Sequence, residues 1–144
     1  MIRVVAVLLG AGLVLSACGS ISASQAMTNW ATQSGFVTNA KTLTNDAKHS
    51  ALALRDPSTS NASLHTVCAV LDLETEQANA ALPTPDSQST NLLSKALNTL
   101  GAGAVQCYGA SSNVAKRARA LRSLSSGAAY LAEAAARVAT VRTP

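Results

Sequence analysis

Apolar side chains recur at helical spacing over most of the chain after residue 24, in steps of three and four. The pattern is clearest in two segments, one near the middle of the chain and one at its end. The two stripes consist of Leu64, Cys68, Leu71, Thr75, Ala78 and Leu82, and of Leu121, Leu124, Ala128, Leu131, Ala135 and Val138. Such alternation is typical of helices that pack side by side at about 20°.

Turn-forming segments at 56–61, 82–87 and 108–112 divide the chain into four helical stretches. The first stretch opens on Ser22 and Gln25, which suit a capping box, and it contains Gly35 as a possible break. Gly101 and Gly103 are expected to loosen the end of the third stretch. Four amphipathic helices joined by short turns predict an all-α fold, an antiparallel four-helix bundle.

The composition favours helices over sheets. The chain has one Trp, two Tyr and one Phe, and much of its apolar content is alanine. A core this poor in large side chains must bring its backbones close together, as alanine-rich helices do, whereas sheets favour β-branched and aromatic residues. The shortage of aromatic rings also argues against recognition of nucleobases by stacking.

The first 18 residues have the three parts of a secretory signal: Arg3, an apolar run over 4–15, and the small residues Ser16 and Ala17. A transmembrane helix is the alternative. A 12-residue run at 1.5 Å per residue spans only about 18 Å of a hydrocarbon core of roughly 30 Å. The run is therefore too short to cross a membrane.

The ending Leu15-Ser16-Ala17-Cys18 resembles the lipobox of bacterial lipoproteins. The resemblance implies that Cys18 receives a diacylglyceryl thioether and that the chain is cut before it. A signal peptide would then occupy 1–17, a lipid-anchored tether 18–23 and a single bundle domain 24–144, on the extracytoplasmic side of the cell membrane. Two acyl chains attach a protein stably to a membrane, whereas a single chain gives only marginal binding. An ordinary secretory signal with an incidental cysteine is the alternative.

With Cys18 acylated, Cys68 and Cys107 remain as an even pair, which outside the cytoplasm predicts a disulfide. A disulfide that closes a loop of about 40 residues stabilises the folded chain by up to about 4 kcal/mol. A straight hairpin turning at Thr84 would hold the two cysteines apart. We therefore expect a late start of the third helix, a break at 101–103, or tilted helices. Two free buried thiols are the alternative.

Charge is unevenly distributed. Residues 62–86 hold four acidic residues and no Lys or Arg, whereas 111–144 hold six cations and one Glu. The candidate contact residues are Lys116, Arg117, Arg119 and Arg122. Such a cluster can bind an envelope protein, an anionic polymer or lipid headgroups. Export argues against nucleic acid as the partner.

His65 and Cys68, with Cys107 and His49, form the best candidate zinc set, but a disulfide would consume both thiolates. We therefore expect no metal and no cofactor. Neither a nucleophile elbow nor a phosphate loop is visible, so the chain is expected to be a non-enzymatic envelope lipoprotein. The alternative is a carrier or sensor that binds a lipid or other small molecule in an apolar pocket between helices.

Overall fold

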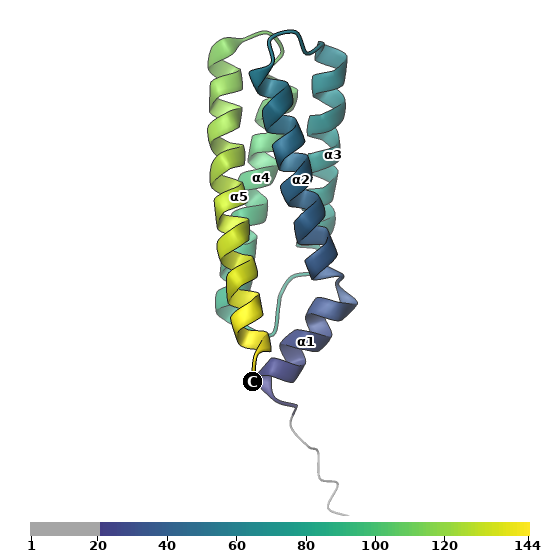
Figure 1. The fold of residues 1–144 in the computed structure, drawn as a ribbon, viewed down its shortest axis with the longest axis vertical. Helices are drawn as coiled ribbons and strands as arrows, with labels where there is room; N and C mark the ends of the chain where they lie inside the picture. Colours follow the sequence, from purple (N-terminus) through teal and green to yellow (C-terminus); the bar gives the residue numbers. More distant parts are fainter. Residues whose placement is uncertain (1–20) are drawn as a thin grey trace, which may run out of the picture.

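The computed structural model describes residues 21–144, so the signal segment 1–17 and residues 18–20 of the expected tether, Cys18 included, lie outside the described residues. The described part forms α1 (Ala23–Gln33), α2 (Phe36–Arg55), α3 (Asn61–Asn79), α4 (Ser87–Tyr108) and α5 (Val114–Arg142). Figure 1 shows α2 to α5 side by side along the long axis of a bundle, with α1 at one end. Within residues 21–144, none of the helices combines the length and the apolar character needed to span a membrane.

The described part has five helices where four were expected, because the first predicted helix is interrupted at Gly35. This residue has φ 62°, in the left-handed region, which glycine adopts without a Cβ penalty. The chain therefore turns between α1 and α2, and the Trp30 and Phe36 rings meet across the turn at 5.3 Å. The expected start at Ser22 is confirmed, since its hydroxyl accepts a hydrogen bond from the Gln25 amide.

Three further helix starts have the same local cause. Ser60, Asp86 and Asn113 each stand at the N-cap and accept a hydrogen bond from a backbone amide of the first turn. Such a cap satisfies one of the donors that a helix start leaves without a partner. Two of the predicted turn segments therefore contain the caps of α3 and α4, and the cap of α5 directly follows the third segment.

The buried stripes follow the predicted spacing, with one shift. In α3, Leu64, Cys68, Leu71 and Thr75 are buried as expected. In α5, Leu124, Leu131 and Val138 are buried as expected, but the residues buried between them are Ala120, Gly127 and Ala134. The predicted companions Leu121, Ala128 and Ala135 are only half-buried. The helix turns its smallest side chains toward the core, which brings its neighbours closer.

The closest approach is between α4 and α5. A Cβ added at Gly103 would lie 2.8 Å from Leu124 Cδ2, and one added at Gly127 would lie 2.8 Å from Leu100 Cγ and 2.9 Å from the Leu100 amide nitrogen. The expectation that Gly101 and Gly103 loosen the helix is wrong, because α4 continues through both. Gly103 and Gly127 remove side-chain bulk where the backbones of α4 and α5 pack together, whereas a Cβ at Gly101 would meet the Thr75 side chain of α3 at 3.2 Å.

The predicted disulfide is confirmed. Cys68 in α3 and Cys107 in α4 are bonded, with their Cα atoms 5.8 Å apart. Of the three expected irregularities, the late start is observed, since α4 begins at Ser87, and a break at 101–103 is not. The connector 80–86 takes up the remaining offset, because an extended chain covers up to about 3.3 Å per residue and a helix only 1.5 Å.

We expect Gly127→Ala to lower the free energy of unfolding by about 2 kcal/mol, despite the better helix propensity of alanine. The added methyl group would meet the backbone of α4, which cannot move aside as a side-chain tip can. Urea denaturation measures the loss. Gly109→Ala is the matched control, since its Cβ would meet only the Val105 carbonyl oxygen at 3.7 Å. Equal stability of both variants would contradict the close α4–α5 contact.

Candidate functional site

The candidate site is the exposed group Lys116, Arg119 and Arg122 on the first half of α5, called here the basic surface. Lys116 and Arg119 line a shallow hollow of about 220 Å³ together with Gln106 of α4 and Gly109, which follows α4. The Asn113 cap fixes the start of this helix through a 2.9 Å hydrogen bond from the Lys116 amide. The three cations therefore project from one ordered helical turn after another, free to meet an anionic partner.

Arg117, the fourth predicted contact residue, does not belong to the basic surface. It is only 8% exposed. Its Nη1 donates to the carbonyl oxygens of Asp56 (2.9 Å) and Leu54 (3.3 Å), and its Nε donates to the Ser111 carbonyl oxygen. The guanidinium thus satisfies carbonyls at the end of α2 and in the α4–α5 turn. Its position begins the buried heptad stripe of Ala120 and Leu124, a register signal that the sequence contained.

The basic surface lies far from the start of the described chain. The Ser24 hydroxyl donates to the Arg142 carbonyl oxygen at 2.7 Å, so the first turn of α1 sits beside the last turn of α5. Arg122 precedes Arg142 by twenty helical residues, which is about 30 Å along the axis. In Figure 1, α1 and the C-terminus lie at one end of the bundle, and the α4–α5 connection lies at the other.

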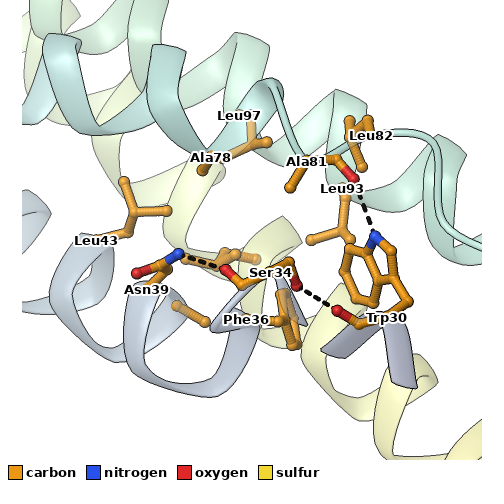
Figure 2. A pocket seen from close by; sticks show the side chains of 12 residues that line it. Trp30, Ser34, Phe36, Asn39, Leu43, Ala78, Ala81, Leu82, Leu93 and Leu97 are labelled. Carbon is orange, nitrogen blue, oxygen red and sulfur yellow. Dashed lines mark hydrogen bonds between the residues drawn. The ribbon is translucent and has the colours of Figure 1, made fainter. Parts of the chain in front are cut away.

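An apolar pocket lies where α1 meets the bundle (Figure 2). Trp30 and Phe36 form one wall, and Leu43, Leu93 and Leu97 form the rest with smaller side chains. The indole Nε1 donates to the Ala81 carbonyl oxygen at 2.9 Å and so ties α1 to the α3–α4 connector. The free volume is about 20 Å³, room for about one water molecule. A small-molecule carrier needs several hundred Å³.

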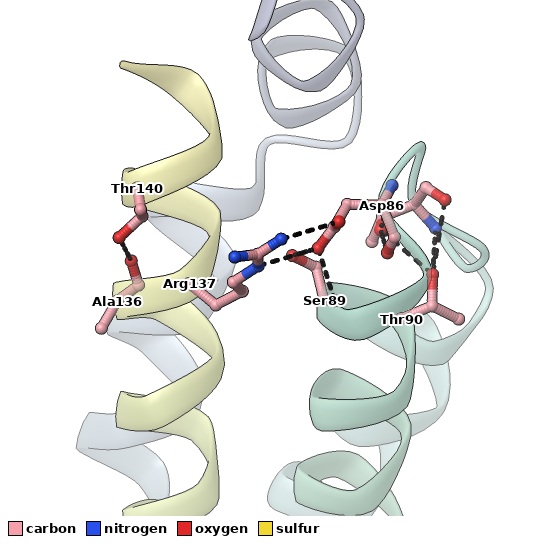
Figure 3. A network of polar contacts seen from close by, with 7 residues as sticks. Asp86, Ser89, Thr90, Ala136, Arg137 and Thr140 are labelled. Carbon is pink, nitrogen blue, oxygen red and sulfur yellow. Dashed lines mark hydrogen bonds and ion pairs between the residues drawn. The ribbon is translucent and has the colours of Figure 1, made fainter. Parts of the chain in front are cut away.

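The acidic segment meets α5 through one ion pair, drawn in Figure 3. Arg137 donates from Nε and Nη2 to the two carboxylate oxygens of Asp86 at 3.1 and 3.0 Å. Asp86 also caps α4 by accepting from the Ser89 amide and hydroxyl. The Arg137 and Ser89 hydrogen bonds hold the pKa of Asp86 well below its usual range. Arg137 is thus used inside the fold.

A second titratable pair lies between α2 and α3. Burial, together with a hydrogen bond and the negative charge of Asp46, raises the pKa of Glu74 to about 7. The Glu74 Oε2 atom is buried without a hydrogen-bond partner among the described residues. His49, 66% exposed, lies with Nδ1 3.7 Å from Asp46. A protonated Glu74 therefore suits this contact better than an ionised one.

The candidate zinc ligands have other contacts. Cys68 and Cys107 are bonded to each other, and the His65 ring stacks on Tyr108 with centroids 4.2 Å apart. His49 lies on α2 beside Asp46. Within residues 21–144, no group of three or more potential ligands of this kind is placed to hold a metal ion.

Comparison with known proteins adds no relative: no family model, curated protein or solved structure matches the chain significantly. A functional proposal therefore rests on the geometry of residues 21–144 and on the sequence pattern of the first 18 residues.

We expect Arg117→Met to lower the free energy of unfolding by about 2–4 kcal/mol, because it leaves carbonyls of the α2 end without their charged donor. Chemical denaturation followed by circular dichroism measures the loss. Arg119→Met removes the same charge from an exposed position, and its effect should stay within about 0.5 kcal/mol. Similar losses in both variants would contradict a structural role special to Arg117.

We expect the stability of the protein to fall as pH rises from about 5 to 7, in part because Glu74 must ionise. The folded-state pKa of Glu74, about 7, exceeds its ordinary value of 4.5. Its contribution is therefore complete below pH 4.5 and disappears as pH passes 7. Glu74→Gln should flatten this part of the curve, measured by urea denaturation at several pH values. Exposed Glu133→Gln serves as the control, and an unchanged slope in Glu74→Gln would contradict the assignment.

Proposed function

We propose that the protein is a non-enzymatic lipoprotein, anchored through Cys18 on the extracytoplasmic side of the cell membrane, that presents its basic surface to an acidic envelope protein. Its folded part would be an antiparallel four-helix bundle of α2 to α5, with α1 leading to the tether. The lipobox-like ending at Cys18 supports the anchor. The proposal that the basic surface meets a partner rests on the position of this surface, at the end of the bundle opposite α1.

The distance between the basic surface and the tethered end of the bundle distinguishes lipid headgroups from a macromolecular partner. Arg122 lies about 30 Å along the bundle from the end that holds the tether. The Debye length at physiological ionic strength is about 8 Å, so headgroups beneath an upright bundle are screened from the basic surface. A macromolecular partner that stands away from the membrane is not. The distance therefore favours a macromolecule over the lipid headgroups of the anchoring membrane, and of the two macromolecular candidates, an acidic protein and an anionic polymer, we propose the protein.

The α1 contacts support an upright bundle. Met27 is fully buried, Trp30 is bonded to the α3–α4 connector, and Ser24 is bonded to the end of α5. With α1 starting at Ala23, only about five residues separate Cys18 from ordered helix. At about 3.3 Å per residue, this tether extends no more than roughly 17 Å. A short tether that ends in a docked helix keeps one end of the bundle near the membrane.

The test uses three variants of the full chain in its native cells. Cys18→Ala should release the protein from the membrane fraction. Lys116→Glu with Arg119→Glu should leave it membrane-bound but abolish crosslinking to its envelope partner. Lys41→Glu with Lys48→Glu makes the same charge change at exposed positions of α2 and should behave like the wild type.

Mass spectrometry of the mature protein gives an independent measurement of the anchor. A diacylglyceryl mass on an N-terminal Cys18 is the expected result. Membrane retention of Cys18→Ala after processing would show that lipidation is not the anchor. Unchanged crosslinking of the Lys116/Arg119 variant would remove the basic surface from the proposal.

A further inference from the structure

A groove runs along the exposed side of the seam between α3 and α4. It consists of two adjoining hollows of about 360 and 240 Å³, which share Asp72 and Glu76. Residues from Cys68 to Asn79 line the groove on α3, and residues from Leu97 to Tyr108 line it on α4. At 1.5 Å per residue each side is about 16 Å long, which is the length of about three helical turns.

Large apolar side chains are exposed in the first hollow, and small residues lie below and beyond them. Leu73 is 55% exposed, Val105 60% and Tyr108 49%. The same hollow is lined by the fully buried Ala104, and the second hollow is lined by Gly101, which has no side chain. Apolar side chains gathered in one exposed groove mark an interaction site more often than isolated ones do. The small residues leave room for the backbone of a partner to approach closely.

The middle of the groove is acidic. Asp72 and Glu76 line both hollows, and among the described residues no Lys or Arg lines either one. α3 has no Lys or Arg, and the one Lys of α4, Lys95, lies over the Tyr130 ring of α5. Neither carboxylate forms an ion pair within residues 21–144. Because the two are four residues apart on one helix, their like charges repel, and a cation bound beside them would relieve that repulsion.

We propose that this groove binds a basic amphipathic helix of another protein, about three turns long. The apolar side chains of that helix would pack against Leu73, Val105 and Tyr108, and a Lys or Arg next to them would pair with Asp72 and Glu76. Burial of the apolar walls supplies affinity, and the carboxylates fix the orientation of the helix. The groove is thus a second binding surface, opposite in charge to the basic surface and separate from it.

The charge of the groove separates this partner from other occupants. A second copy of the chain that used the same groove would bring Asp72 and Glu76 against their own counterparts, with like charges on both sides of the interface. Anionic lipid headgroups and acidic protein segments would be repelled in the same way. The shape selects a helix and the charge selects a basic one, so the favoured occupant carries Lys or Arg beside apolar residues at helical spacing.

The test selects binders from a displayed library of random peptides, with the mature full chain in detergent as the bait. Peptides that bind the groove should carry Leu, Ile, Val or Phe three and four residues apart, with Lys or Arg beside them. Their affinity should fall roughly tenfold in Leu73→Ser with Val105→Ser, because the apolar walls are lost. It should fall roughly fivefold in Asp72→Asn with Glu76→Gln, because the charge is lost. Asp72→Lys with Glu76→Lys should select acidic peptides instead.

Leu52→Ser with Glu133→Gln makes the same kinds of change at exposed positions of α2 and α5, and should bind the selected peptides as the wild type does. Circular dichroism checks that each variant is folded. A selection that yields no peptide sensitive to the groove variants would overturn the inference, and so would one that enriches acidic peptides on the wild type. Self-association of the wild type that Leu73→Ser with Val105→Ser abolishes would overturn it as well, since the occupant would then be a second copy.

Discussion

The close contact of α4 with α5 is the constraint on which the rest of the structure depends. The core consists mainly of leucine and alanine, so helix backbones must come near to each other for buried surfaces to touch. Gly103 and Gly127 provide that approach, each facing a leucine of the opposite helix. With these helices so near, little volume remains inside the bundle. This explains why the apolar pocket beneath Trp30 has room for about one water molecule.

The polar residues that might have served chemistry instead fasten the ends of the helices. At one end, Arg117 holds carbonyls of α2 and of the turn before α5. At the other, Arg137 binds the Asp86 cap of α4. Both arginines lie on α5, so they attach this helix to α2 near its start and to the N-cap of α4 near its end. The surface that a partner could contact lies between the Arg117 and Arg137 contacts. It consists of the outer turns of α5 and the exposed sides of α3 and α4.

The sequence predicted the helical class, the first helix cap and the cysteine pair because each rests on local or pairwise chemistry. The Ser22 cap, the turn segments and the Cys68–Cys107 bond follow from residues close in sequence or unique in type. Two features were missed because they depend on tertiary packing. A glycine's sequence position does not tell whether it breaks a helix, as Gly35 does, or lets two helices meet, as Gly103 does. Periodicity alone also left Arg117 looking like one cation of a surface cluster, although its register with Ala120 and Leu124 is that of the core.

In the proposed lipoprotein, an anchor at one end of the chain gives the asymmetry of the bundle a physical meaning. A protein free in solution could offer its basic surface to a partner from any direction, but a chain held at one end has a fixed axis. The hydrogen bond from Ser24 to the Arg142 carbonyl oxygen places α1 at the end of the bundle away from Lys116, Arg119 and Arg122. An anchor that precedes α1 would therefore turn the basic surface away from the anchoring membrane, toward partners that stand outside it.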